Sequence, residues 1–342
     1  LAKTLQTIAE GGRAGFYEGE VAADIVYYLR SKGGLHTLDD FANAAGGYVT
    51  PIKTNYRGYD VFECPPAGQG IVALAMLNIL SGFDLSKFDP LSADRYHLEI
   101  EAARLAYGDR NARLGDPEFS RIPVDEWLSD SHADRLRANI SMDRCVDPLP
   151  PSDLPLHADT VYLTVVDRDR NAVSFINSVF SSFGSCLVSP KSGVVLHNRG
   201  QGFVIDPGHP SCVAPNKRPL HTIIPGMLVK DGRAQMPFGV MGGHYQAIGH
   251  AHLLTSLLDW NMDLQSALDS PRVFPNVLDL DLLVQAESNV PEYVLADLER
   301  RGHQMISAAR PVGGAQAIWI DWEEGVLRGA SDPRKDGMAI GY

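Results

Sequence analysis

A threonine at the start of a predicted strand is the residue of this sequence best suited to nucleophilic chemistry. Thr160 follows Asp159 in the stretch Asp-Thr-Val-Tyr-Leu-Thr-Val-Val-Asp, after a proline-rich segment at residues 145–158. If the Thr160 hydroxyl attacks the carbonyl of Asp159 and water then hydrolyses the ester, Thr160 becomes an N-terminal residue. Its α-amine, with a pKa of about 8, can then accept the hydroxyl proton during catalysis. We predict that Thr160 is a nucleophile exposed by self-cleavage of the Asp159–Thr160 bond; the alternative is an ordinary strand residue after an interdomain loop.

Such a nucleophile also needs N–H groups that stabilise a negatively charged oxygen, and a glycine pair offers them. Gly242 and Gly243 follow the apolar run at residues 238–241 and precede a predicted helix. Glycine presents its backbone N–H without an obstructing Cβ, and a helix N-terminus aims N–H dipoles at one point. We therefore predict an oxyanion hole at Gly242-Gly243, although glycine pairs before helices are common in purely structural roles.

Two other patterns suggest different chemistry. Gly68-Gln69-Gly70 follows a predicted strand and resembles a dinucleotide-binding fingerprint, but no second parallel strand with a terminal acid follows soon after. His244, His250 and His252 cluster on a predicted helix without a flanking acidic ligand. A packed helix N-terminus is the favoured interpretation of the first pattern, and packing histidines that of the second.

Composition and charge narrow the classes of partner. The chain has 342 residues and a formal net charge of -12, so nucleic acid and anionic membranes are not expected as main partners. Its four cysteines are far apart and form no CxxC pair, which disfavours a zinc ribbon. No apolar run reaches the ~18 residues typical of a membrane span. The sequence starts with Leu1, so we expect an N-terminal region to be missing; the compartment, bacterial cytoplasm or periplasm, stays undetermined.

Hydrophobic periodicity predicts a chain whose strands cluster centrally, with helices before and after them. Helices are expected within residues 1–45 and at 71–80, 93–114, 126–140, 246–260, 263–270 and 291–302. Strands are expected within residues 48–64 and at 160–167, 171–178, 194–197, 223–229, 236–240, 315–322 and 326–329. This order favours a layered α+β sandwich over a doubly wound parallel sheet.

Several motifs, taken in this order, resemble the γ-glutamyltransferase (γ-glutamyltranspeptidase) family of N-terminal-nucleophile hydrolases, and the similarity spans nearly the whole chain. The most specific motifs lie at residues 159–167, 171–173, 183–184, 215–219 and 242–243. Further matches lie at residues 9–13, 16–17, 56–59, 106–110, 329–334 and 341–342.

The resemblance implies a four-layer αββα sandwich and a precursor that cleaves itself into two associated subunits. Residues 1–159 would be the C-terminal part of the large subunit, whose N-terminal part is absent, and residues 160–342 the small subunit. After cleavage the two would form one intertwined domain. Thr160 would be the nucleophile, Gly242 and Gly243 the oxyanion hole, and Ser178 the hydroxyl that assists Thr160. The family needs no metal or organic cofactor, and its assembly would extend to a dimer of heterodimers.

The substrate-binding positions depart from the family pattern. Phe180 stands where the family offers an asparagine, Gly202 where it has an acid that holds the substrate ammonium, and His221-Thr222 where it has paired serines. Losing that acid costs more than ~1.5 kcal/mol of binding, and Arg199 adds a cation. The pocket therefore favours an acyl group that has a carboxylate and no amine, as in the divergent acylase-like branch of the family.

The resemblance thus predicts an amidohydrolase or acyltransferase that cleaves a small-molecule amide through a threonyl acyl-enzyme. It would pass the acyl group to water or an amine, with relaxed or altered γ-glutamyl selectivity. Two alternatives stay open. One is a small carboxylate-amide hydrolase acting on oxamate- or glutaryl-type amides, and the other is an inactive family member that serves as a binding subunit.

Overall fold

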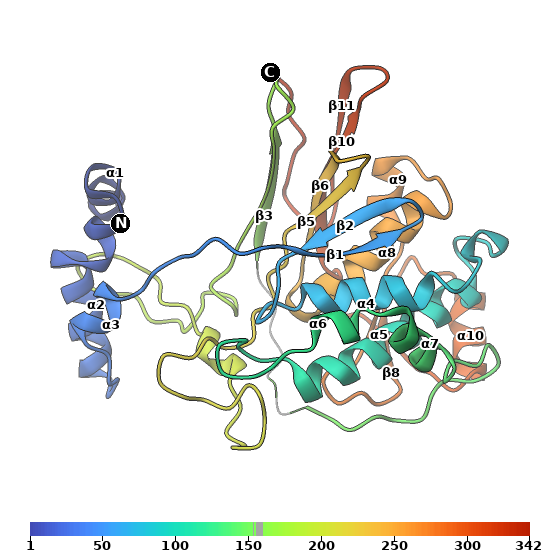
Figure 1. The fold of residues 1–342 in the computed structure, drawn as a ribbon, viewed down its shortest axis with the longest axis horizontal. Coiled ribbons are helices and arrows are strands. Elements are labelled where there is room, and N and C mark those ends of the chain that lie inside the picture. The colour runs from blue at the N-terminus through green and yellow to red at the C-terminus, as the bar shows by residue number, and fades with distance from the viewer. Residues whose placement is uncertain (153, 155–159) are drawn as a thin grey trace. The chain divides into compact units, whose positions relative to one another are not determined.

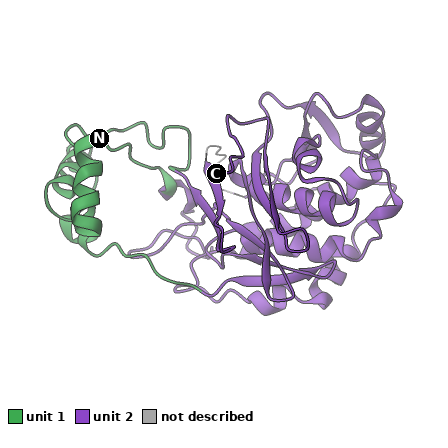
Figure 2. Cartoon of the chain, turned by 90° about the horizontal axis from the view of Figure 1, so that it is seen from above, with its two compact units in different colours: residues 1–49, 179–199 green, residues 50–178, 200–342 purple. Residues whose placement is uncertain are grey.

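The computed structural model describes residues 1–342 except 153 and 155–159. The chain forms two compact units, which are coloured separately in Figure 2. The smaller unit comprises residues 1–49 and 179–199, and the larger one residues 50–178 and 200–342. Each unit has its own packing and is described by itself.

The larger unit is built on a six-stranded antiparallel sheet (Figure 1). In spatial order its strands are β1 (Ile52–Tyr56), β2 (Tyr59–Glu63), β5 (Gly226–Lys230), β6 (Arg233–Met241), β10 (Gly314–Asp321) and β11 (Val326–Ser331). Strands on both sides of residue 160 therefore share one sheet, since β2 pairs directly with β5.

Three helices pack together beside this sheet, namely α4 (Gly70–Leu80), α5 (Ala93–Arg113) and α8 (Gln246–Leu258). All residues of α4 are buried, as an apolar helix between other elements requires. Side chains such as Leu74, Phe238 and Leu254 are fully buried in one continuous core. Burial of apolar surface on this scale is the main force that holds the layers together.

A separate hairpin, β3 (Val161–Val166) and β4 (Ala172–Asn177), packs against β6 and β10. The buried side chains of this hairpin are Tyr162 and Ile176, and residues on the opposite face, such as Leu163, are exposed. This alternation is that of strands with one face on a core. The larger unit therefore stacks a helical layer, a six-stranded sheet and a second β layer, in agreement with the predicted α+β sandwich.

The remaining elements of the larger unit show where sequence periodicity is too weak. Strands β7 (Val273–Pro275), β8 (Leu283–Ala286) and β9 (Gln304–Ser307) form a third sheet that the periodicity does not predict, because such short runs carry little pattern. The predicted helix at residues 126–140 forms two, α6 (Val124–Trp127) and α7 (Asp130–Arg137). Helices α9 (Leu264–Asp269) and α10 (Glu292–Arg300) lie close to their predicted positions.

The smaller unit contains α1 (Ala2–Tyr17), α2 (Gly19–Ser31), α3 (Leu38–Ala42) and the segment 179–199. The predicted strand at residues 194–197 is wrong, because only an isolated bridge between Val188 and Val195 forms there. Asp24 of α2 accepts hydrogen bonds from the N–H groups of Lys191 and Ser192, at 3.1 and 2.8 Å, which ties this segment to the helices. Within the described residues, no helix has both the length and the apolar character needed to cross a membrane.

Candidate active site

Thr160 stands directly before β3, and its hydroxyl is buried. Within the described part of the chain, no residue forms a hydrogen bond with its Oγ1 atom. A buried hydroxyl without a partner is unfavourable by roughly 1–3 kcal/mol, so it calls for a specific explanation. A reactive group that waits for substrate is one such explanation. Asp159, the predicted partner in the scissile bond, lies outside the described residues.

The register of the hairpin brings the predicted assisting hydroxyl close to Thr160. Val161 pairs with Asn177 in the β3–β4 ladder. The ladder ends there; one more step in the same register would set Ser178 opposite Thr160. Directly opposed residues of antiparallel strands have Cβ atoms about 5 Å apart. The arrangement therefore suits the predicted pairing of the two hydroxyls.

Tyr162 fastens the strand that carries Thr160 to β6. A Cβ atom at Gly239 would overlap the Tyr162 ring, so glycine is required there for the close approach. The Tyr162 hydroxyl lies 2.8 Å from Ser174 Oγ, which donates to the carbonyl of Phe238 at 3.1 Å. Burial raises the pKa of Tyr162, so this phenol stays protonated. Met241 packs in the same cluster as Tyr162, which sets the start of β3 on the strand that ends at the glycine pair.

The Gly242-Gly243 turn has the geometry that only glycine adopts readily. The φ angles are 123° at Gly242 and 60° at Gly243, and a Cβ on Gly242 would lie 2.9 Å from Gly313 Cα. The carbonyl of Gly242 accepts a hydrogen bond from the N–H of Tyr245 at 3.0 Å, where a short 3₁₀ turn leads into α8. Among the described residues, neither glycine N–H has an acceptor. These two groups are the donors that an oxyanion hole needs.

A buried polar cluster lies under this turn, and sequence patterns alone do not reveal it. Gln69 Nε2 donates to the carbonyls of Thr222 and Gly243, both at 2.9 Å. Arg110 Nη1 donates to Gln69 Oε1 at 3.0 Å and lies 2.8 Å from His244 Nδ1. Burial lowers the pKa of Arg110 to about 10, which leaves the guanidinium charged at neutral pH. We call Gln69, Arg110 and His244 the Gln69 cluster.

The Gln69 cluster also accounts for the apparent dinucleotide fingerprint. The strand before Gly68-Gln69-Gly70 is β2, and both of its neighbours, β1 and β5, run antiparallel to it. A dinucleotide-binding unit requires parallel strands, so that alternative is wrong. Gly70 is needed for packing instead, because a Cβ there would lie 2.7 Å from Glu63 Cβ.

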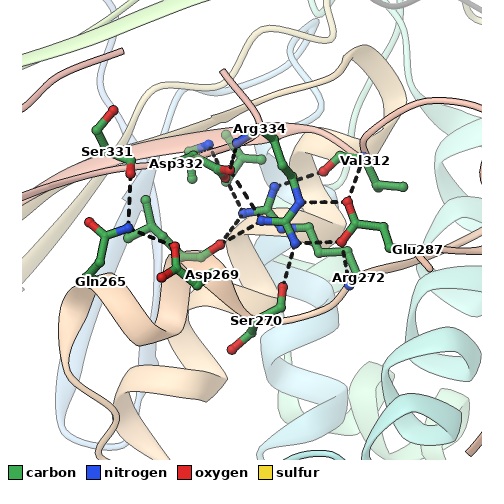
Figure 3. A network of polar contacts seen from close by, with 12 residues as sticks. Gln265, Asp269, Ser270, Arg272, Glu287, Val312, Ser331, Asp332 and Arg334 are labelled. Atoms are coloured by element: carbon green, nitrogen blue, oxygen red, sulfur yellow. Dashed lines mark hydrogen bonds and ion pairs between the residues drawn. The ribbon is translucent and has the colours of Figure 1, made fainter. Parts of the chain in front are cut away.

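A second buried cluster contains two arginines and two acids (Figure 3). Arg272 pairs with Asp332, and Arg334 pairs with Glu287, both at 2.5 Å. We call these four residues the carboxylate clamp, because the two acids also bind backbone. Glu287 accepts from the N–H of Val312 at 2.9 Å, and Asp332 accepts from that of Ala315 at 2.8 Å. The clamp thereby holds the chain around Gly313, which abuts Gly242.

The predicted substrate-binding residues of the larger unit lie around the Gln69 cluster. Thr222 is fully buried, and within the described residues its Oγ1 has no hydrogen-bond partner. His221 Nδ1 lies 2.7 Å from the carbonyl of Pro219. At Gly202 a Cβ would lie 2.9 Å from the carbonyl of Leu220, so the backbone leaves no room for an acidic side chain. The lost ammonium-binding acid is therefore not a simple substitution.

Phe180 and Arg199 belong to the smaller unit and form a pair of their own. Phe180 is buried with a φ of 80°, which is rare for an aromatic residue and often accompanies function. The Arg199 guanidinium lies 5.3 Å from the centre of its ring, and burial lowers the pKa of Arg199 to about 10. Both residues belong to the smaller unit, whereas Thr160 belongs to the larger unit.

The histidines on and near α8 have structural partners. His250 Nδ1 lies 2.6 Å from Glu63, and His252 Nδ1 lies 2.8 Å from Glu99. Within the described residues, no group of three or more possible metal ligands occurs. A cavity of about 440 Å³ opens beside α5, lined by residues such as Asp109, Ser152 and His209, but it includes none of the predicted site residues.

Comparisons with known proteins match the whole chain. The gamma-glutamyltranspeptidase family model covers residues 1–342. The glutathione hydrolase-like YwrD proenzyme of Bacillus subtilis (strain 168) is 36% identical over 346 residues, which covers 100% of this chain and 65% of that protein. The chain thus spans less than two thirds of the length of this relative.

Solved structures give the same picture. A cephalosporin acylase from Bacillus halodurans superposes with a TM-score of 0.91 and 39% identity, covering 100% of this chain and 62% of the acylase. A chain of gamma-glutamyltranspeptidase from Pseudomonas nitroreducens matches with a TM-score of 0.50 and 25% identity. That match covers 98% of the solved chain but only 53% of this one.

Proposed function

Because this chain belongs to the gamma-glutamyltranspeptidase family of N-terminal-nucleophile hydrolases, we propose that it is a self-processing amidohydrolase or acyltransferase with Thr160 as its nucleophile. The family and the α+β fold class predicted from the sequence are confirmed by these matches. The observation that carries the proposal is the buried hydroxyl of Thr160, which has no hydrogen-bond partner among the described residues. Thr160 directly precedes β3, which packs on β6, and β6 leads directly into the Gly242-Gly243 turn.

In the proposed reaction, Thr160 Oγ1 attacks the carbonyl carbon of the substrate amide while the α-amine of Thr160 takes the hydroxyl proton. The carbonyl oxygen becomes negatively charged and accepts hydrogen bonds from the N–H groups of Gly242 and Gly243. When the C–N bond breaks, the α-amine returns the proton to the leaving amine. Water or a second amine then attacks the threonyl ester and releases the acyl group, with Ser178 assisting Thr160.

Self-cleavage at Asp159–Thr160 would produce the fragments 1–159 and 160–342. The match to the Pseudomonas nitroreducens chain covers 53% of the present chain. Residues 160–342 make up nearly the same fraction of it. The two fragments would stay associated, because β2 of the first pairs with β5 of the second, and α4 packs on α8. Separating them would expose the shared core, so we propose one intertwined domain. A dimer of such heterodimers stays a prediction.

The processing test compares the wild-type protein with Thr160→Ala. We expect the wild type to give two bands on a denaturing gel, the smaller one with the N-terminal sequence Thr-Val-Tyr-Leu, and the variant to stay uncleaved. Thr164→Ala is a matched control, since Thr164 lies on the same strand and its hydroxyl donates to the carbonyl of Val173. A wild-type chain that stays whole, or a cleaved Thr160→Ala chain, would contradict the proposal and favour an inactive binding subunit.

For the substrate we propose an acyl group that carries a carboxylate and no α-ammonium. The crowded backbone at Gly202 supports this, because it has no acid to pair with an ammonium. The wild type should cleave glutaryl-p-nitroanilide at least ~10-fold more efficiently than γ-glutamyl-p-nitroanilide, the factor that about 1.4 kcal/mol corresponds to. Oxamate should be tested alongside as the smallest carboxylate amide. Efficient γ-glutamyl transfer to glycylglycine would contradict this substrate class.

A further inference from the structure

Gln69 joins three segments of the candidate site by direct hydrogen bonds. Its side-chain amide donates to the carbonyls of Thr222 and Gly243, and its backbone N–H donates to the carbonyl of His221 at 2.9 Å. Gln69 is fully buried at the N-terminus of α4, where its own helix is rigidly packed. A fixed donor of this kind sets the orientation of the peptide groups that it binds.

The peptide planes next to the glycine pair are held from beneath by this cluster. Gln69 binds the carbonyl of Gly243, and the hydroxyl of Tyr107 donates to the carbonyl of His244. The carbonyl of Gly242 is taken by the N–H of Tyr245. In a trans peptide the N–H lies on the side opposite the carbonyl, so fixing the Gly242 carbonyl also fixes the direction of the Gly243 N–H. Gly243 has a positive φ and no side chain, so the bond from Gln69 to its carbonyl removes rotational freedom that glycine would otherwise have.

Arg110 orients Gln69 and, within the described part of the chain, has no carboxylate partner. Its Nη1 atom binds Gln69 Oε1, and its Nε and Nη2 atoms bind Asn111 Oδ1 at 2.9 and 2.7 Å. Among the described residues, no acidic group lies within ion-pairing distance of Arg110, although its side chain is fully buried. The neighbouring Tyr107 ring, 4.3 Å from the guanidinium carbon, contributes only a weak cation–π contact.

We propose that Gln69 is a positioning residue for the oxyanion turn and that the positive charge of Arg110 stabilises the negative charge that develops there. By binding the Gly243 carbonyl, Gln69 restricts rotation of Gly243 in the turn that presents the two glycine N–H groups. Arg110 fixes Gln69 in the orientation that donates to Gly243. A buried cation without a counterion exerts a stronger field than one that is paired. This inference rests on the proposed function, because it assigns the support for the reaction of Thr160.

The decisive variant is Gln69→Glu, which keeps the shape of the side chain but replaces its donor with an acceptor. The new carboxylate cannot donate to the carbonyls of Thr222 and Gly243, and it neutralises Arg110. We expect kcat on glutaryl-p-nitroanilide to fall about 10- to 100-fold with KM within about twofold, the pattern of a contact that acts in the transition state. Gln265→Glu makes the same chemical change on exposed α9 and should leave both constants unaltered.

A second pair of variants keeps the proposal testable if Gln69→Glu folds poorly. Arg110→Lys retains a buried cation, whereas Arg110→Met removes it at similar size, so we expect Arg110→Lys to retain at least about fivefold more kcat. Thermal unfolding of both verifies that they are folded. If the two variants have equal kcat, or if folded Gln69→Glu stays within threefold of the wild type, this inference is wrong while the proposed function stands. If wild type and Thr160→Ala are equally inactive, the proposed function fails and the inference with it.

Discussion

Two buried arginine clusters border the Gly242-Gly243 turn, and they are built from opposite kinds of partner. In the carboxylate clamp, Arg272 and Arg334 each bind an acid at 2.5 Å, and those acids also bind backbone N–H groups around Gly313. In the Gln69 cluster, Arg110 contacts Gln69, Asn111 and His244, and no acid of the described residues forms an ion pair with it. The clamp therefore pairs two arginines with two acids, whereas Arg110 has no acidic partner among the described residues.

The difference indicates that the two clusters contribute differently to the same turn, one to its stability and the other to its chemistry. A balanced buried network contributes rigidity and geometry, and it is sensitive to the loss of either partner. Burying a cation without a counterion costs free energy. Proteins accept this cost at sites where the cation stabilises a negative charge. We expect substitutions in the clamp to act mainly on stability and substitutions in the Gln69 cluster to act mainly on turnover.

The largest effect on stability is expected for Asp332→Ala. This change leaves Arg272 buried without its counterion and leaves the N–H of Ala315 without its acceptor. Breaking a buried ion pair from one side costs about 3–5 kcal/mol, which urea unfolding measures directly. Glu324→Ala serves as the control, since the Glu324–Arg328 pair at 2.7 Å is exposed and should contribute less than ~1 kcal/mol. Equal losses in both variants would remove the distinction between clamp and surface.

Arg110→Met should destabilise the fold less than Asp332→Ala. It removes a charge that has no counterion among the described residues, so no ion is left unpaired there. It leaves Gln69 Oε1 without this donor and Asn111 Oδ1 without the two hydrogen bonds that it accepts from Arg110. Unsatisfied buried acceptors cost about 1–3 kcal/mol, and relief from burying the cation offsets part of this loss. If urea unfolding shows Arg110→Met to be the more damaging change, Arg110 is a structural anchor and the comparison fails.

The sequence predicts the parts of the molecule whose signals are local. Strand alternation over residues 160–167 and 171–178 predicts the hairpin of β3 and β4, and the apolar run from Ile71 predicts the buried helix α4. The order of the motifs predicts the family, which the match over the full chain confirms. The roles of Thr160, Ser178 and the glycine pair stay predictions that the geometry supports.

What the sequence does not reveal depends on contacts between distant residues. Gln69 and Gly243 are far apart in the chain, and their hydrogen bond follows only from the packing of α4 beside α8. Because of the same packing, Gly68-Gln69-Gly70 has a structural role in the folded protein, although its sequence resembles a nucleotide-binding motif. Asp332 and Arg334 belong to a motif whose order signals the family, but their pairing with Arg272 and Glu287 requires the folded sheet (Figure 3).

Acid should weaken the carboxylate clamp before it affects the Gln69 cluster. Burial alone would raise the pKa of Glu287 and Asp332, but their arginine partners and the backbone N–H groups outweigh it and lower both. A lowered folded-state pKa contributes stability that is present above the ordinary carboxyl pKa and is lost as the pH falls through the folded value. Unfolding free energy should therefore decline below about pH 4.5, the ordinary range of these acids.

The variant Glu287→Gln isolates the contribution of the clamp to this acid response. It removes one titrating group while keeping an acceptor for the N–H of Val312, so the decline below the ordinary carboxyl pKa should become shallower. Urea midpoints measured across this range give the slope for both proteins. Identical slopes would mean that other carboxyl groups dominate the acid response.

The smallest effect is expected for Gln265→Ala, although Gln265 lies in the same view as the clamp (Figure 3). Its Nε2 atom donates to Asp269 Oδ1 at 2.8 Å and to the carbonyl of Ser331 at 3.1 Å, both at an exposed site. Water replaces both bonds when the side chain is truncated, and alanine favours the helix α9, so the change in unfolding free energy should stay within about 0.5 kcal/mol. A loss comparable with that of Asp332→Ala would show that the number of hydrogen bonds, rather than burial of charge, sets the strength of this region.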